Sequence, residues 1–388
     1  MNKLDLNFWR CSSIVEIIYP AIQNPGPELS FDDQFAFRPS GSTTAALIML
    51  LQTITTLLQT NSFVLVYALD FSKAFDTVRH YTLLEKFALL NLPDRIYNWL
   101  VNYFEGRTHC TFFGGLMSAL EEITAGVIQG SGLGPAAYIV DASDLRTVYP
   151  GNYLIKYADD TYLIIPAHLS HTRIEELENI EIWAKKNNLR LNQSKSEEMI
   201  FSNPRSKVKF TPPPSPLGIP RVKSMKVLGV ILTGTFSMSE HIAKIVSSCA
   251  QALYAIRMLM AHGLNQSSIQ LIFSTTILAK LQYASQAWIG FANTSDMNRL
   301  EAFLVKSKRS GFCPSALPSF EELCNISDLQ LFNSVVSNTH HVLYKLLPPK
   351  RDNSHNLRPR AHEFTLPDKA TSLHSKNFII RQLFRNIY

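Results

Sequence analysis

The chain has 388 residues, a formal net charge of +6 and a sequence pI of about 8.9. Its hydrophobic content of 46% and its 23 phenylalanines exclude a disordered chain, which lacks the aromatic side chains that build a core. The mild basic excess is compatible with a polyanionic partner but does not demonstrate one. This length predicts roughly two or three structural units.

Cysteine usage and the N-terminal sequence bear on the compartment. Five cysteines without a repeated spacing argue against a disulfide framework and indicate a reducing environment. Cys313 and Cys324 precede His340 and His341, but the gaps do not fit a zinc motif. No signal peptide is recognisable, and no apolar run approaches membrane-spanning length. We therefore expect a soluble, intracellular protein.

Four elements are expected in the first part of the chain. Residues 1–30 show turn chemistry and no periodic pattern. Apolar residues recur at helical spacing over 40–60, which predicts a helix. The run "FVLVYALD" at 63–70 predicts a buried strand that ends at an aspartate. Two helices are expected next, over 78–92 and 93–107.

Strands and helices alternate in the middle of the chain. A glycine-rich loop opens the segment 126–149, which continues as an apolar helix. The stretch "KYADDTYLII" places two adjacent aspartates between β-rich runs and predicts a hairpin over 153–165. An amphipathic helix that runs into a short strand is expected over 171–192, and further strands at 196–203 and 226–232. This order is typical of an α+β fold, an antiparallel sheet of the split βαβ kind with helices on one face.

The pattern changes to helices from about residue 240. A long amphipathic helix is expected over 239–263, and a pair of helices over 319–348. The sequence therefore predicts three parts along the chain, 1–62, 63–235 and a helical region at 236–388.

Three aspartates are the candidate catalytic residues. Asp70 ends the buried strand, and Asp159 and Asp160 form the tip of the hairpin. If both elements pair in one sheet, the three carboxylates converge and repel one another unless a cation neutralises them. Their hard oxygen atoms suit Mg²⁺, and two such ions can activate a hydroxyl and stabilise a leaving oxygen in phosphoryl transfer. Adjacent aspartates are also ordinary in solvated turns, so the flanking sequence must decide between the two interpretations.

Six segments in order resemble the reverse transcriptase of a non-LTR retrotransposon, of the LINE-type, jockey-like kind. The match spans roughly residues 31–245. It implies an RNA-directed DNA polymerase with a remnant of the fingers and a connecting helix at 1–62, a palm at 63–235 and a thumb-like region at 236–388. The segments are "DQFAFRPSGSTTAA" (33–46), "YALDFSKAFDTVRHYTLLEKF" (67–87), "GVIQGSGLGP" (126–135), "YADD" (157–160), "NNLRLNQSKSEEMIF" (187–201) and "KVLGVIL" (226–232).

The resemblance implies roles for residues at matching positions. Asp70, Asp159 and Asp160 would ligate two Mg²⁺ ions, with Mn²⁺ as a substitute. Phe75 would lie under the nucleotide sugar and exclude a 2′-hydroxyl, the alternative being an ordinary core phenylalanine. Lys195 would protonate the leaving pyrophosphate or hold its charge. The further nucleotide-binding positions are Gln129, Gly130, Lys73 and Arg38.

The chain also departs from the family pattern. Ala36 stands where glycine is usual, and the fingers region is shortened, with Arg10 as a candidate survivor of its triphosphate contacts. Asp141 interrupts the apolar helix. A truncated, inactive retroelement protein that at most binds RNA is therefore the alternative to an active enzyme, whereas Phe75 and Ala158 disfavour an RNA-templated RNA polymerase. The expected partners are an RNA template, a DNA primer and deoxynucleoside triphosphates, with no membrane.

Overall fold

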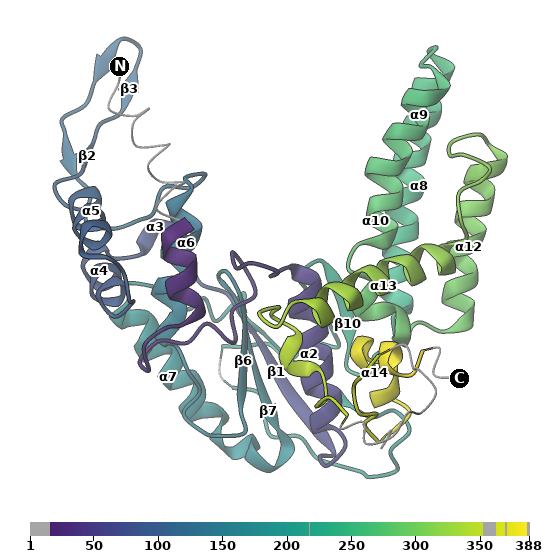
Figure 1. Cartoon of the computed structure of the whole chain (residues 1–388), viewed down its shortest axis with the longest axis horizontal. Coiled ribbons are helices and arrows are strands. Elements are labelled where there is room, and N and C mark those ends of the chain that lie inside the picture. Colours follow the sequence, from purple (N-terminus) through teal and green to yellow (C-terminus); the bar gives the residue numbers. More distant parts are fainter. Residues whose placement is uncertain (1–15, 217, 352–361, 369–370, 386–388) are drawn as a thin grey trace. The chain divides into compact units, whose positions relative to one another are not determined.

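The computed structural model describes residues 16–216, 218–351, 362–368 and 371–385. Helices and strands alternate in the first part of the chain, and helices dominate after β10 (Val230–Thr233; Figure 1). This mixture confirms the expected α+β class. Arg10, the candidate triphosphate contact, lies outside the described residues.

The chain divides into two compact units whose segments interleave along the sequence. Strands β1 (Phe63–Leu69) and β8 (Glu197–Ser202) each begin in one unit and end in the other. The two units are defined by contacts in space, and each contains several separate segments of the chain. They therefore do not test the three consecutive parts expected from the sequence, which remain a prediction. The first unit comprises Met1–Ser42, Val66–Glu198 and Pro213–Pro220, and the second comprises Thr43–Leu65, Met199–Pro212 and Arg221–Tyr388.

A four-stranded sheet in the order β6-β7-β1-β8 carries the candidate site (Figure 1). Strand β1 is buried along nearly its whole length, because its apolar side chains cover both faces. Strands β6 (Tyr153–Tyr157) and β7 (Asp160–Pro166) form an antiparallel hairpin in which Tyr157 pairs with Asp160. The hairpin expected over 153–165 is therefore confirmed.

The helices expected in the first unit are present, and one more appears near the N-terminus. Residues 16–23 are helical, which corrects the expectation of an irregular segment. Ile18, Ala21 and Ile22 form its buried stripe, at the i, i+3, i+4 spacing of a packed helix. The expected helices are α4 (His80–Ala88), α5 (Asp94–Phe104), α6 (Leu133–Asp141) and α7 (Arg173–Lys186), and short turns of helix are added at α3 (Ala74–Thr77), η1 (Ala142–Asp144) and η2 (Ala167–Thr172).

Four short strands lie between α5 and the glycine-rich loop and form two small hairpins that extend beyond α5 (Figure 1). The inner hairpin turns at Gly114 and Gly115, both of which have positive φ. Phe112 and Phe113 beside the turn are 73% and 85% exposed, so these strands add nothing to the core. The strands are β2 (Thr108–His109), β3 (Phe112–Phe113), β4 (Leu116–Met117) and β5 (Glu121–Glu122).

A buried ion pair joins helices of the first unit. Lys86 of α4 is 6% exposed, and its ammonium lies 3.5 Å from Oδ1 of Asp141 at the end of α6. The same Nζ donates hydrogen bonds of 2.8 Å to Asp144 and to Asn187, which follows α7. Burial raises the pKa of Asp141 to about 6, although Lys86 favours the charged form. The aspartate that interrupts the apolar helix therefore has a partner on another helix.

The stretch "KVLGVIL" forms a hairpin and not the single strand expected from the sequence. Strand β9 (Ser224–Val227) pairs antiparallel with β10 (Val230–Thr233). Leu228 and Gly229 lie between them with φ values of +45° and +87°. Two positive φ values reverse the chain with the twist that a tight hairpin needs, and a continuous apolar run conceals this turn.

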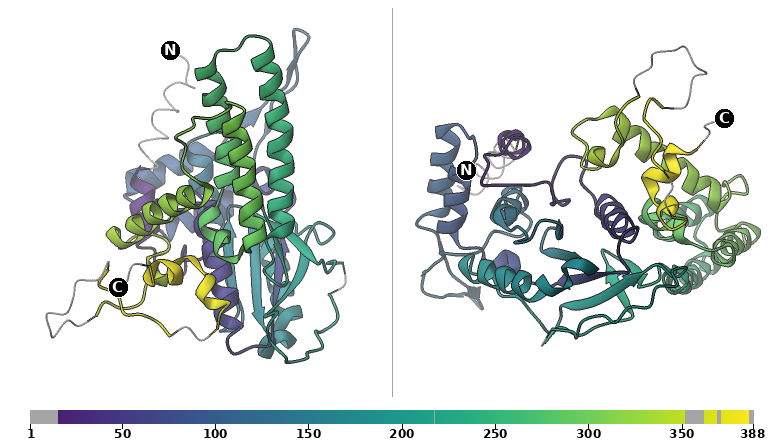
Figure 2. Two further views of the ribbon diagram at one scale, coloured as in Figure 1. Left: turned by 90° about the vertical axis from the view of Figure 1, so that its right-hand side faces the viewer. Right: turned by 90° about the horizontal axis from the view of Figure 1, so that it is seen from below.

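The long helix α8 (Ser239–Ala261) is the centre of the second unit. It packs against α12 (Thr294–Arg309) and the π-helical segment η3 (Phe273–Leu278), and both panels of Figure 2 show these green helices side by side. Contrary to the expectation from the sequence, α8 is long and apolar enough to cross a membrane. This criterion rests on length and composition only, and the buried residues of α8 form one stripe along the helix.

The remaining elements of the second unit include one correction. Of the two helices expected over 319–348, α13 (Phe320–Ser337) is present, and the other is a single 3₁₀ turn, η5 (Tyr344–Leu346). A capping box begins α13, in which Ser319 and Glu322 exchange hydrogen bonds. The other elements are α2 (Thr43–Leu57), α9 (Gln266–Ile272), α10 (Ala279–Gln282), α11 (Ser285–Trp288), η4 (Ile289–Phe291), η6 (His374–Lys376) and α14 (Phe378–Leu383).

Candidate active site

Asp70 lies directly after β1, in a loop that a second segment holds in place. Its backbone N–H donates to Ser196 Oγ at 3.2 Å, and its carbonyl accepts the N–H of Asn192 at 2.8 Å. The next residue, Phe71, forms an antiparallel bridge with Leu191. The segment before β8 therefore fixes the direction in which the chain leaves the strand.

Asp159 and Asp160 lie at the tip of the β6–β7 hairpin. Asp159 is half-buried within the two-residue turn, whereas Asp160 begins β7 and is exposed. The other turn residue, Ala158, has a φ of +55°. The apolar strands on either side of the turn, β6 and β7, are part of the sheet. The turn therefore places both carboxylates at the edge of the sheet.

The three carboxylates interact electrostatically. Burial raises the pKa of Asp159, and the negative charge of Asp70 raises it further. Although Asp160 reaches the surface, desolvation by the surrounding protein raises its pKa to about 6, and the charges of Asp159 and Asp70 add to that shift. Carboxylates from two segments far apart in the sequence are therefore close enough to repel one another.

The donor atoms at this edge fit a hard divalent cation. All three side chains offer carboxylate oxygens, which suit Mg²⁺ or Mn²⁺. A cation among them would offset the mutual repulsion, which adds to the effect of burial on the pKa values of Asp159 and Asp160. In the described part of the chain, however, no group of three His, Cys, Asp or Glu side chains has the arrangement of a metal site. The carboxylate oxygens of the three aspartates therefore suit a divalent cation, but the three side chains are not arranged around a common metal position.

The glycine-rich loop lies against the segment that follows Asp70. Val127 N–H donates to the Phe75 carbonyl at 2.8 Å, and Gly126 N–H donates to the Val78 carbonyl at 2.7 Å. A Cβ on Gly126 would lie 2.9 Å from the Asp76 carbonyl oxygen, and the φ of Gly126 is +93°. Only glycine satisfies both constraints, so two separate motifs pack backbone against backbone here.

Phe75 is held by two aromatic rings. It stacks on Tyr138 with ring centroids 4.5 Å apart and an interplanar angle of 20°, and it meets Phe37 edge-on at 6.4 Å. Burial raises the pKa of Tyr138 well above its usual value, and Asp159 is the next largest cause. The ring behind Phe75 is therefore within electrostatic reach of the carboxylates, and Phe75 itself is only half-buried.

Gln129 and Gly130 lie at the start of the glycine-rich loop's exposed turn. The Gln129 side chain is exposed, and its Nε2 donates to Asp76 Oδ1 at 3.1 Å. Gly130 has a φ of +80°, and nothing lies within 4 Å of the position that a Cβ would take. The glycine is therefore required by its backbone conformation, and the space beside it is open.

The three basic residues expected at the site differ in their surroundings. Arg38 Nη1 donates to the carbonyls of Phe31 and Gln34, and burial lowers the pKa of its guanidinium. Lys73 and Lys195 are exposed, and neither ammonium has a hydrogen bond or ion pair within the described ranges. Arg38 thus stabilises its own loop, whereas the side chains of Lys73 and Lys195 are exposed to solvent.

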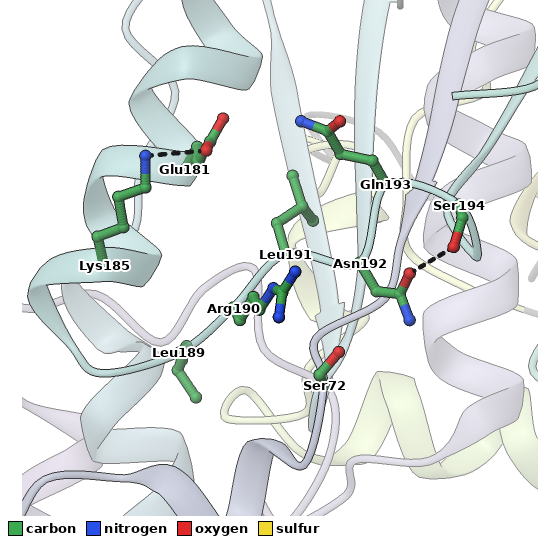
Figure 3. A pocket seen from close by; sticks show the side chains of 9 residues that line it. All are labelled: Ser72, Glu181, Lys185, Leu189, Arg190, Leu191, Asn192, Gln193 and Ser194. Atoms are coloured by element: carbon green, nitrogen blue, oxygen red, sulfur yellow. Dashed lines mark hydrogen bonds and ion pairs between the residues drawn. The ribbon is translucent and has the colours of Figure 1, made fainter. Parts of the chain in front are cut away.

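A polar pocket of about 760 Å³ lies beside the loop after Asp70. Figure 3 shows Ser72 at one wall and the segment 189–194 along another. Helix α7 contributes Lys185, whose ammonium is paired with Glu181 at 2.9 Å. The lining segment ends at Ser194, one position before Lys195, and Lys195 itself is not among the residues that line the pocket.

Two residues at the site were missed by sequence reasoning. Gln34 accepts the N–H of Ala158 at 3.1 Å, although 124 positions separate the two. Tyr138 supports Phe75 from within an apolar helix, where an aromatic residue indicates ordinary core. No local sequence pattern distinguishes Gln34 or Tyr138 from its neighbours. The one indication was that Gln34 lies within the segment 33–46, which resembles the family.

Comparisons with known proteins agree on one family. Residues 4–232 match the family model described as Reverse transcriptase (RNA-dependent DNA polymerase). The probable RNA-directed DNA polymerase from transposon X-element of Drosophila melanogaster is 27% identical over 291 residues, which cover 72% of this chain and 31% of that protein. The RNA-directed DNA polymerase from mobile element jockey of Drosophila melanogaster is 29% identical over 292 residues, which cover 71% and 31%. The chain thus spans 31% of the length of these relatives.

Solved structures give a weaker likeness. A telomerase from Candida tropicalis in complex with a fragment of telomeric RNA matches with a TM-score of 0.48 and 12% identity, over 79% of this chain and 49% of that one. The apo telomerase from Candida tropicalis matches with a TM-score of 0.44 and 12% identity, over 78% and 51%.

Proposed function

The chain belongs to the reverse transcriptase family, and we propose that it adds deoxynucleotides to the 3′-hydroxyl of a DNA primer on an RNA template. The observation that carries this proposal is the placement of carboxylates from two different motifs in one sheet: Asp70 directly follows β1, and Asp159 and Asp160 lie at the tip of the β6–β7 hairpin, whose strand β7 is the neighbour of β1. The names of the X-element and jockey relatives support an origin in a non-LTR retrotransposon. In this proposal the fingers remnant occupies 1–62, the palm 63–235 and the thumb-like region 236–388.

The proposed reaction is a phosphoryl transfer. The primer 3′ oxygen forms a bond to the α-phosphorus of the nucleotide, the bond to the pyrophosphate breaks, and the hydroxyl proton passes to solvent. Asp70, Asp159 and Asp160 would hold two divalent ions, Mg²⁺ or Mn²⁺, which neutralise charge on the attacking and leaving oxygens. Lys195, whose side chain is exposed, would hold or protonate the departing pyrophosphate.

Primer extension tests the proposal directly. The purified chain, a primed poly(rA) template, labelled deoxythymidine triphosphate and Mg²⁺ should yield extended primer. Binding of the template–primer without extension would support an inactive protein that only binds RNA. Extension that survives Asp159→Ala would indicate a contaminating polymerase or a different site. We expect the reaction to take place inside the cell, where the RNA template and the deoxynucleotides are found.

Replacing Phe75 with valine should admit ribonucleotides. We propose that the ring, fixed by its stacking on Tyr138, lies under the nucleotide sugar and excludes the 2′-hydroxyl. The ratio of ribonucleotide to deoxynucleotide incorporation should rise roughly 10–100-fold, the usual range for a change in pocket shape. Single-nucleotide extension with each nucleotide measures the ratio. Phe75→Tyr keeps the ring and should keep the wild-type ratio, and an unchanged ratio in Phe75→Val would reject the role.

Lysines in the second unit support a nucleic-acid partner. Lys226, Lys244 and Lys280 line a cavity of about 240 Å³, and its lining includes no carboxylate. The Lys280 ammonium donates to Ser248 Oγ at 2.5 Å. Positive charges without acidic partners suit phosphate oxygens. We propose that the thumb-like region uses them to hold the template–primer duplex by its backbone, without reading sequence.

Replacing Lys244 with alanine should make template–primer binding less sensitive to salt. A lost phosphate contact releases fewer counterions, so the slope of log affinity against log salt should fall in magnitude by about 0.9. Fluorescence anisotropy of a labelled primer on poly(rA), measured across a salt series, gives the slope. Lys209→Ala, an exposed lysine of the same unit outside the cavity, is the matched control. Equal slopes for the wild type and both variants would remove the cavity from the binding surface.

A further inference from the structure

The turn that carries Asp159 has an unfavourable backbone conformation. Ala158 has a φ of +55°, in the left-handed region that disfavours an L side chain and accepts glycine. Tyr157 and Asp160 pair directly across the hairpin, so Ala158 and Asp159 are the two turn residues. Two-residue turns usually place glycine, asparagine or aspartate at such positions. The conformation of Ala158 therefore needs support from outside the hairpin.

Gln34 provides a contact of this kind. Its side chain is 2% exposed, and its Oε1 accepts the N–H of Ala158 at 3.1 Å and the N–H of Ala36 at 3.0 Å. The Nε2 atom of the same amide has no hydrogen-bond partner among the residues that the structure describes. The amide oxygen therefore makes the hydrogen bonds of this side chain, and these bonds link the turn to the loop around Gln34.

The loop around Gln34 is fixed to the hairpin on both sides of this contact. Phe35 N–H donates to the Lys156 carbonyl at 2.8 Å, and Lys156 N–H donates to the Asp33 carbonyl at 2.7 Å. The Lys156 ammonium is 3.0 Å from Asp33 Oδ2, with only 1% of its side chain exposed. Because these bonds anchor the backbone on either side of Gln34, its amide oxygen is held at one distance from the turn.

We propose that Gln34 is a positioning residue for the catalytic hairpin. Its amide oxygen holds Ala158 in the left-handed conformation and thereby sets the direction of the Asp159 carboxylate. Gln34 touches no substrate in this role and acts through Asp159. The proposal rests on the proposed function, since the direction of the carboxylate matters for holding a divalent ion. A displacement of about 1 Å in such a group lowers a rate roughly 100-fold.

The decisive variant is Gln34→Met, which removes the acceptor and keeps the length of the side chain. We expect kcat to fall roughly 10–100-fold while the KM for the deoxynucleotide and the affinity for template–primer stay unchanged. Glycine takes a positive φ without strain, so adding Ala158→Gly should restore about tenfold of the lost rate. A residue that served only the overall fold would not be rescued by a change in the turn. The unfolding temperature of each variant is measured first, and all rates are then compared at a temperature at which every variant is folded.

Metal binding gives a second measurement that does not depend on DNA synthesis. Titration of the nucleotide-free chain with Mn²⁺, followed by electron paramagnetic resonance, should show a dissociation constant raised roughly tenfold in Gln34→Met and recovered in the double variant. Unchanged Mn²⁺ affinity in Gln34→Met, or a double variant no better than the single one, would overturn the proposal. If the wild-type chain makes no DNA, but Mn²⁺ affinity still falls in Gln34→Met and recovers in the double variant, the polymerase proposal fails and the role of Gln34 stands.

Discussion

Replacing Asp159 with asparagine should lower DNA synthesis about 1000-fold. The change removes one negative charge where a divalent ion would be held and keeps the shape of the side chain. Such an ion contributes several kcal/mol of transition-state stabilisation, and about 1.4 kcal/mol corresponds to each factor of ten. Single-nucleotide extension on primed poly(rA) measures the rate, and anisotropy checks that the template–primer still binds.

Stability separates this effect from unfolding. Because burial raises the pKa of Asp159, its ionised form destabilises the folded chain at neutral pH. An uncharged asparagine should therefore leave the unfolding temperature equal or higher. Asp94→Asn, at the start of α5, is the matched control and should retain full activity. A fully active Asp159→Asn would show that this carboxylate is not part of the catalytic centre.

Replacing Lys86 with methionine should lower the free energy of unfolding by about 3–5 kcal/mol, because it leaves a buried aspartate without its partner. The Asp141 side chain is fully buried, 3.5 Å from the Lys86 ammonium. The loss is measured by urea unfolding at pH 7, followed by circular dichroism. Adding Asp141→Leu removes the stranded charge, so the double variant should regain most of the stability. A double variant as unstable as the single one would mean that the lost packing of Lys86 and its lost hydrogen bonds to Asp144 and Asn187, and not the unpaired charge of Asp141, are the cause.

The same loss should depend on pH. Burial raises the pKa of Asp141 to about 6 in the folded chain from its ordinary value of 3.8, so between these two pH values the folded chain keeps a proton that the unfolded chain releases. The contribution of Asp141 to stability therefore falls as pH rises between those two values. Without Lys86 the folded pKa rises further, and Asp141 can be neutral at pH 5. Lys86→Met should consequently be less destabilised at pH 5 than at pH 7. Lys185→Met, which removes an exposed partner of Glu181, should change stability little at either pH.

Local sequence was sufficient for the elements that carry the carboxylates. The apolar run that ends at Asp70 is a strand, and the paired aspartates sit at the end of a hairpin. Strand burial and turn preference depend on neighbouring residues, so they can be recognised from a few positions. The same local view failed at Leu228 and Gly229, where an unbroken apolar run conceals a turn.

The contacts that join distant segments were decided only by the tertiary structure. Gln34 meets Ala158, Tyr138 stacks on Phe75, and Lys86 pairs with Asp141, each across a long stretch of chain. The sequence by itself determined which side chains could supply the chemistry, because residue type and local pattern are encoded position by position. It did not determine what holds those side chains in place, because a hydrogen bond or ring contact between remote segments depends on how the whole chain packs and leaves no periodic trace along it.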